Sequence, residues 1–185
     1  MKTIFQIIKG WLPLAIATAG LCGLAYLAVQ QSMRIGANDP QIQMAEDAAS
    51  ALNGGANPDS IVPAGKVELA TSLAPYIMVF DNSGNVLAAS ATLHGALPVY
   101  PAGVLDYTRS HAEDRVTWQP EAGVRMATVV VRYDQGFVLA GRSLREVEIR
   151  IDNIGKISGL ALLAIWAATL VVITLAELVG RKRGA

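Results

Sequence analysis

The sequence is poor in the residues from which reactive and metal-binding sites are usually built. It holds a single cysteine, Cys22, and two histidines, His94 and His111, in 185 residues. One cysteine cannot form an intrachain disulfide, and neither histidine has a partner at metal-ligand spacing. The motifs H-E-x-x-H and G-x-S-x-G and the phosphate-binding glycine loop are also missing from the sequence. We therefore expect no catalytic residues, no bound metal and no cofactor.

Net charge is missing too, because fifteen basic residues balance fifteen acidic ones. A neutral chain has no overall field that would attract nucleic acid, so we expect no nucleic-acid partner. What the sequence has in excess is apolar residues. They make up 52% of the chain, against roughly 45–50% in ordinary soluble domains.

The apolar excess is concentrated in two stretches without charge. Nineteen residues from Trp11 to Val29 carry no charged side chain, nor do twenty residues from Ile157 to Ala176. At about 1.5 Å per residue, each stretch is about 30 Å long as a helix, which matches the hydrocarbon core of a bilayer. The sequence therefore predicts a two-pass membrane protein with spans at residues 11–30 and 157–178, and the lipid bilayer is its first expected partner.

Basic residues flank both spans on the outer sides of the sequence. Lys2 and Lys9 precede the first span, and Arg181, Lys182 and Arg183 follow the second. By the positive-inside rule, both termini are expected in the cytoplasm of a plasma-membrane protein. The expected division is a cytoplasmic N-terminus (1–10), the first span, an extracytoplasmic domain (31–156), the second span and a cytoplasmic tail (179–185).

A cleaved signal peptide is the alternative for the first span. The apolar run is longer than the usual 7–15 residues, however, and Tyr26 spoils the cleavage pattern that ends at Ala28. We therefore favour an uncleaved anchor. Within it, Ala15, Ala19 and Gly23 recur every four residues and could form a smooth strip for contact with another helix.

The segment between the spans begins with a helix and continues with a β-hairpin. Asp39, which is followed by proline, is typical of a helix N-cap, and the helix is expected to run to Leu52. The stretch 53–65 contains several glycines and prolines and predicts a linker. Two apolar runs follow at 76–81 and 86–90, and the Asp-Asn-Ser-Gly-Asn sequence between them predicts a hairpin turn.

A helical crossing and three more strands complete this segment. The crossing is expected at 101–113, where a proline stands at the start of a helix. Strands at 115–119, 124–133 and 137–141, separated by turn residues, predict an antiparallel meander. The expected fold class is α+β: a five-stranded antiparallel sheet with a long N-terminal helix and covering helices, held between two transmembrane helices.

This order of elements resembles the PAS-like fold of extracytoplasmic Cache sensor domains, over approximately residues 39–153. The residues that carry the resemblance are the strand Tyr76–Phe80, Asp81 and Gly84 in the turn, and the strand Val86–Ser90. In that family a long membrane-proximal helix leads into the five-stranded sheet, which is interrupted after its second strand by helices and loops. The resemblance implies a small molecule bound between the sheet and its covering loops, and a role in signal transduction.

The sequence departs from that family after the second span. About nine residues follow, from Glu177 to Ala185, where related sensors continue into kinase, chemoreceptor or cyclase domains. We therefore expect the signal to pass through a partner protein in the membrane, unless the chain is a truncated receptor. The alternative function is a non-enzymatic membrane anchor or assembly subunit whose outer domain binds another protein.

Apolar residues before the second span follow the three-four spacing of a helix-helix seam. These are Leu144, Val147, Ile151 and Ile154, and Ser158 continues the pattern. One interpretation is a stalk helix that pairs with the 39–52 helix, or with a second copy of the chain, and passes a shift of the domain to the membrane helix. The other is an amphipathic helix that lies on its own sheet.

Arginines in the predicted strands are candidates for ligand binding. Along 124–133 both alternating faces are mostly apolar, so this strand is expected to be covered on both sides. An arginine there needs an anion or a carboxylate partner unless it reaches water from the strand end. The best candidates for lining a pocket are Tyr107, Trp118, Arg125 and Arg142. A carboxylate or another small anion would suit this set.

Overall fold

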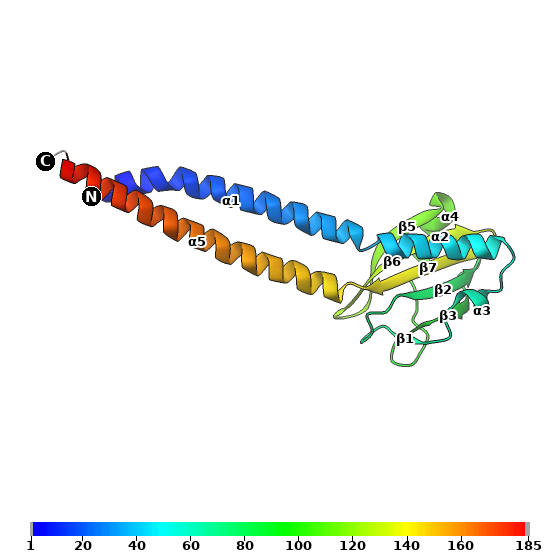
Figure 1. Cartoon of the computed structure of the whole chain (residues 1–185). Helices are drawn as coiled ribbons and strands as arrows, with labels where there is room; N and C mark the ends of the chain where they lie inside the picture. The colour runs from blue at the N-terminus through cyan, green and yellow to red at the C-terminus, as the bar shows by residue number, and fades with distance from the viewer. Residues whose placement is uncertain (1, 184–185) are drawn as a thin grey trace. The chain divides into compact units, whose positions relative to one another are not determined.

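The computed structural model describes residues 2–183, which divide into two compact units (Figure 1). The first, which we call the helical unit, consists of the residues up to Met33 together with those from Ile149 onward. The second, which we call the α/β unit, runs from Arg34 to Glu148.

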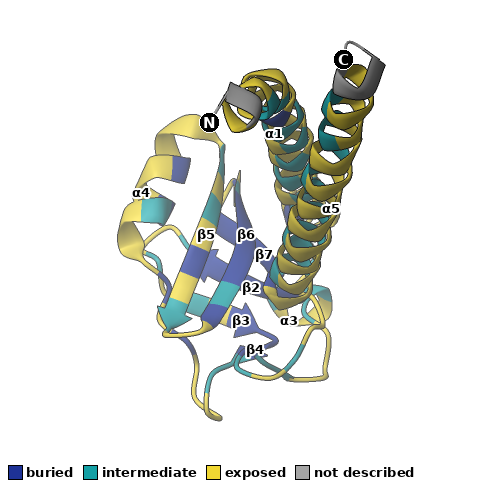
Figure 2. Cartoon of the chain, turned by 90° about the vertical axis from the view of Figure 1, so that its left-hand side faces the viewer, coloured by how far each residue is buried: buried dark blue, intermediate teal, exposed yellow. Residues whose placement is uncertain are grey.

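The two predicted spans lie within helices α1 (Lys2–Gly36) and α5 (Arg145–Arg183). In the described part of the chain, these two helices are long and apolar enough to cross a membrane, with mean hydropathies of 1.9 and 2.4 over their most apolar windows. Hardly any of either window is buried within the protein, and Figure 2 shows both helices exposed along most of their length. A helix that is apolar all round is suited to an apolar solvent such as a bilayer.

Within the helical unit, two tryptophans join α1 to α5. Trp11 of α1 lies edge-on to Trp166 of α5, with the ring centroids 5.8 Å apart. The Trp11 indole Nε1 donates to the carbonyl oxygen of Trp166 and to Oγ1 of Thr169, both at 3.1 Å. Trp166 Nε1 in turn donates to Oγ1 of Thr18 at 3.1 Å. Because an apolar surrounding offers no other partner for an indole N–H, these bonds favour the paired state of the two helices.

The strip of small residues on α1 faces α5 of the same chain. Ala15 is buried, and Ala19 and Gly23 line a shallow hollow together with Gly155 and Ser158 of α5. The small residues of α1 and this part of the predicted seam on α5 thus face each other within one chain. One interpretation of the seam pairs it with the 39–52 helix, and this helix packs on the sheet. The first seam residues, Leu144 and Val147, pack with Ala127 of the sheet, as the alternative interpretation predicts.

The α/β unit has the expected α+β fold class. Its five-stranded antiparallel sheet has the order β3-β2-β7-β6-β5. The strands are β2 (Tyr76–Asp81), β3 (Val86–Ala89), β5 (Glu113–Glu121), β6 (Val124–Tyr133) and β7 (Gly136–Ser143). The observed bounds of β2 and β6 are identical to those predicted from the apolar runs and the turn residues. Strands β5 and β7 extend beyond their predicted ends because their pairing with β6 continues past their apolar stretches.

Several short elements have no counterpart in the sequence prediction. Strands β1 (Val67–Glu68) and β4 (Ala91–Thr92) pair in parallel as a separate two-stranded sheet. Helix α3 (Pro58–Ile61) interrupts the predicted linker, and the Asn57 side chain caps it by accepting a hydrogen bond from the backbone N of Asp59 at 3.0 Å. Elements of two to four residues are too short to show a hydrophobic period.

Helix α2 (Asp39–Asn53) confirms the predicted helix but begins differently. Asn38 is the capping residue, and its side chain makes no capping hydrogen bond. Asp39 is instead in the first turn, where a negative charge favours the positive end of the helix dipole. At the other end, the Asn53 side chain accepts a hydrogen bond from the backbone N of Asp134 at 2.8 Å, which ties α2 to the turn between β6 and β7.

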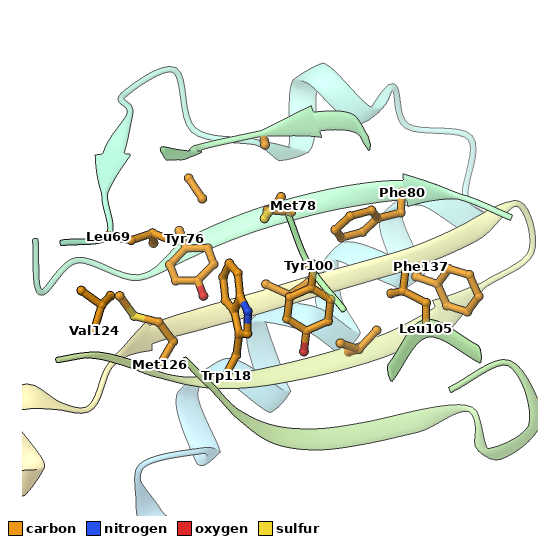
Figure 3. Close-up of a cluster of buried hydrophobic side chains, with 14 residues drawn as sticks. Leu69, Tyr76, Met78, Phe80, Tyr100, Leu105, Trp118, Val124, Met126 and Phe137 are labelled. Carbon is orange, nitrogen blue, oxygen red and sulfur yellow. The ribbon is translucent and has the colours of Figure 1, made fainter. Parts of the chain in front are cut away.

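Both faces of the sheet are covered, as the apolar faces of β6 predict. Helix α2 covers one face with small residues, chiefly Ala45, Ala48 and Ala49. Helix α4 (Ala102–His111) and the connecting loops cover the other face, which holds larger side chains (Figure 3). We call this second cluster the aromatic core; its largest members are Tyr76, Met78, Phe80, Tyr100, Trp118, Met126 and Phe137.

The hairpin turn between β2 and β3 forms as predicted. Asp81 Oδ1 accepts hydrogen bonds from the backbone N of Ser83 and of Asn85, both at 2.8 Å. The Asn85 side chain, followed by these backbone donors, lowers the pKa of the Asp81 carboxyl. Gly84 has φ +85°, a region that is free of strain for glycine.

Candidate functional site

Two of the four predicted site residues lie on the α4 side of the sheet. Trp118 pairs across the strands with Met126 and is buried in the aromatic core, where it lies edge-on to Tyr100 with ring centroids 5.0 Å apart (Figure 3). Tyr107 lies on α4 and is 48% exposed. Its ring stacks on His111, with centroids 3.8 Å apart. Trp118 thus fills the core, while Tyr107 lies at the surface.

The other two, Arg125 and Arg142, lie on the α2 side. Arg142 of β7 is opposite Ala127 of β6, and Arg125 is two residues before Ala127 on the same strand. Residues two apart on a strand share a face, and cross-strand neighbours do as well, so both guanidinium groups belong to one face. The structure therefore brings Arg125 and Arg142 together and separates them from Trp118.

Arg125 has a carboxylate partner from the chain itself. Its Nη1 donates to Oε1 of Glu148, in the first turn of α5, at 2.5 Å. The two side chains are 41% and 42% exposed, so water reaches this ion pair. Half-exposed ion pairs contribute roughly 0.2–1 kcal/mol to stability, which means that this pair can open at little cost.

Two buried polar atoms on this side of the sheet have no hydrogen-bond partner in the described part of the chain. Arg142 Nε and Gln41 Oε1 are both inaccessible to solvent and have no hydrogen-bond partner among the residues that the structure describes. Gln41 lies one helical turn before Ala45, which packs on the strands beside Ala127, so it lies toward the same end of the sheet as Arg142. An unmade hydrogen bond of a buried group costs about 1–3 kcal/mol. A water molecule or a bound anion would remove this cost.

Together these residues form what we call the junction site: Gln41, Arg125, Arg142 and Glu148. The site lies where α2 begins and where β7 passes into α5. It holds two guanidinium groups and one carboxylate, and guanidinium groups are the donors that proteins commonly use for carboxylates and phosphates. For Arg125 the sequence predicts either an anionic partner or contact with water at the strand end, and the structure shows both. The sequence does not identify Glu148 or Gln41. Glu148 could be found only by knowing that the first turn of α5 returns to β6.

A groove lies elsewhere, beside the edge strand β3. It has a volume of about 360 Å³ and is lined by α3, the following loop, β3 and Leu97. Asp59 and Lys66 bring opposite charges to its wall. Lys66 Nζ donates to the carbonyl oxygen of Ala89 at 2.7 Å, which holds the ammonium group against the strand. The sequence prediction treats this region as a linker and misses the groove.

No protein-family model, curated protein or solved structure matches this chain. The candidate site therefore rests on its geometry.

The two histidines take structural positions. The Glu68 carboxylate accepts hydrogen bonds from the backbone N of His94 and Gly95, and the first of these is the main reason that the Glu68 pKa is lowered. His94 Nε2 lies 2.8 Å from Oε2 of Glu121, and this carboxylate raises the His94 pKa. Within residues 2–183 no three potential ligands gather as a metal site.

Proposed function

We propose that this protein is a membrane-anchored sensor module. Helices α1 and α5 span the bilayer, the α/β unit lies outside the cytoplasm, and a partner protein carries the signal onward. The observation that carries this proposal is the direct passage from sheet to membrane helix. Strand β7 ends at Ser143 and α5 starts at Arg145, continuing for 39 residues. A change in the position of β7 is thus passed to a helix long enough to span a membrane.

We further propose that the α/β unit is a PAS-like domain of the Cache type. A long helix, α2, precedes the sheet, and the sheet has five antiparallel strands. The sequence between its second and third strands, from Ser90 to Ala112, holds β4, a loop and α4. These features agree with the resemblance described above, which supports a sensory role.

The proposed orientation has both termini in the cytoplasm of a cell with this protein in its plasma membrane. It is supported by Lys2 and Lys9 before the first span and by Arg181, Lys182 and Arg183 after the second.

The ligand in this proposal is a small anion, such as a carboxylate, bound at the junction site. Arg125 and Arg142 share a face of the sheet, and arginine suits planar anions because its guanidinium can donate two parallel hydrogen bonds. Tyr107 and Trp118 belong to the other face and are left out of the proposed site. An anion held here would bind beside the end of β7, next to the point where α5 starts.

The test is a binding screen on the full chain in lipid nanodiscs. The probes are small mono- and dicarboxylates, inorganic phosphate and sulfate, and the readout is the thermal shift of the α/β unit followed by calorimetric titration. We expect at least one probe to bind the wild type and to lose its binding in Arg125→Ala. The matched control is Arg132→Ala, at the far end of the same strand, which should bind normally. A protein that binds none of these probes would contradict the proposed ligand class.

A second candidate function is an anchor or assembly subunit. It is favoured by the groove beside β3, where Leu87 and Leu97 are 48% and 52% exposed, and by Val99, which is 89% exposed. Exposed apolar side chains close to an edge strand are typical of protein contacts. Purification from native membranes without added ligand separates the two functions. A partner bound at constant stoichiometry that is lost in Leu97→Asp favours assembly.

A further inference from the structure

The guanidinium group that Arg125 would offer to an anionic ligand already binds Glu148 of the same chain. A ligand carboxylate and the Glu148 carboxylate would bind to the same guanidinium. We propose that Glu148 is a built-in competitor: ligand binding at Arg125 and the Arg125–Glu148 ion pair exclude each other, so that an arriving anion releases the first turn of α5. This inference rests on the proposed function, because it concerns the same anion site.

The geometry of the pair fits a contact that opens. Only Nη1 of Arg125 is bound to Glu148, although a guanidinium can donate two parallel bonds to a single carboxylate. Both side chains are close to half exposed, so water can solvate each group when the pair separates. A fully buried pair would leave an uncompensated charge on opening and would not serve as a reversible contact.

Arg142 gives the ligand an advantage over Glu148. Its Nε is buried and lacks a partner among the described residues, and the guanidinium lies on the same face as Arg125. A free anion placed between the two arginines can accept hydrogen bonds from both. Glu148 is fixed to α5 and contacts Arg125 alone among these two. Nε itself is closed to solvent, but Arg142 as a residue is partly exposed, so an external anion would approach its guanidinium from the exposed side.

Other contacts also hold the start of α5 on the α/β unit. Arg145 Nη2 donates to the carbonyl oxygen of Thr71 at 2.6 Å, and Leu144 packs with Ala37 and Ala127. The pair with Arg125 is made by Glu148, the last residue of the α/β unit. Its loss would loosen α5 at the residue where the α/β unit ends, while Arg145 and Leu144 keep the helix attached.

The experiment compares anion affinity in three forms of the full chain in lipid nanodiscs, with malonate, acetate and inorganic phosphate as probes. In Glu148→Gln the competitor is removed, and we expect binding to tighten about two- to fivefold, the range of a half-exposed ion pair. The matched control is Asp152→Asn. This substitution also removes one negative charge from α5, and it breaks the ion pair of Asp152 with Lys156. We expect its affinity to equal that of the wild type.

Hydrogen exchange gives a second readout, which a general charge effect would not move. The backbone N of Glu148 donates to the carbonyl oxygen of Leu144 in the first turn of α5. We expect exchange at this turn to speed up when a probe binds the wild type. In Glu148→Gln exchange should already be fast without probe and change little when the probe is added.

The outcomes separate this inference from the proposal beneath it. If neither the wild type nor Glu148→Gln binds any probe, the proposed anion site is wrong and the inference falls with it. If the wild type binds and Glu148→Gln binds equally or more weakly, the anion site stands and the competitor is refuted. Equal tightening in Asp152→Asn would also refute it, because the effect would then be one of overall charge.

Discussion

Two tyrosines of the aromatic core are buried alike but differ in their hydrogen bonds. Tyr76 is 0% exposed, and its hydroxyl has no partner among the described residues. The Tyr100 hydroxyl lies 2.9 Å from Oγ1 of Thr128. Burial raises the pKa of both, to about 12 for Tyr100, so both are neutral at ordinary pH. Removal of each hydroxyl should therefore change stability in opposite directions.

The magnitudes follow from the cost of an unmade hydrogen bond. A buried hydroxyl without a partner costs about 1–3 kcal/mol, so Tyr76→Phe should raise the free energy of unfolding by about 1 kcal/mol. Tyr100→Phe loses a bond and should lower it by about 0.5–1.5 kcal/mol. For a unit of about 115 residues, Arg34 to Glu148, 1 kcal/mol corresponds to about 4 °C in Tm.

The measurement is thermal unfolding of the full chain in detergent micelles, followed by circular dichroism, with hydrogen exchange of β2 and β7 to locate the change. We expect Tm to rise in Tyr76→Phe and to fall in Tyr100→Phe. A fall of similar size in both variants would show that the Tyr76 hydroxyl has a partner, such as an enclosed water molecule, and would refute the reasoning.

Three further results are expected. Gly141→Ala should destabilise the α/β unit by about 3 kcal/mol, because a Cβ there would lie 2.5 Å from the ring of Tyr76; a loss below 1 kcal/mol in thermal unfolding would contradict this packing. Glu121 raises the pKa of His94, so the contribution of this pair to stability should be full below about pH 6.5 and decline as pH rises through the folded-state pKa. The Tm difference between wild type and His94→Gln should therefore shrink in scans from pH 5 to 9. A difference that grows with pH would contradict the pairing. Trp11→Phe loses both indole bonds to α5 and should weaken helix pairing by about 0.6 kcal/mol per bond; faster hydrogen exchange in α1 with an unchanged Tm of the α/β unit would support it, and unchanged exchange would not.

Strands were predictable where a hydrophobic period coincided with turn chemistry. Tyr76–Asp81 and Val124–Tyr133 match the structure to the residue because each is apolar and bounded by Gly, Asp or Asn. β5 was less predictable, since it carries Pro120 and several charged residues and owes its length to pairing with β6. The two-residue pair β1–β4 depends on contacts between distant segments, which leave no local signal.

The site was predictable in its chemistry but only partly in its membership. The alternation of β6 places Arg125 on one face of the strand and indicates that it needs an anionic partner or contact with water from the strand end. Whether Trp118 or Arg142 lies on the same face of the sheet as Arg125 depends on strand register. Register is set by pairing across the sheet. The partner Glu148 depends on where α5 starts relative to β6. Strand register and the position of α5 relative to β6 both depend on contacts between distant residues, which leave no local pattern in a single sequence.

The junction between β7 and α5 has a consequence for the angular position of the α5 side chains. A single residue, Leu144, separates the strand from a helix of 39 residues. An α-helix turns about 100° per residue, so one inserted alanine would rotate every α5 side chain by that angle relative to β7. Seven inserted residues would bring it back to within about 20°. The number of residues here therefore sets the angle at which the first turn of α5 follows β7. We expect relatives of this chain to vary at this point in residue type long before they vary in length.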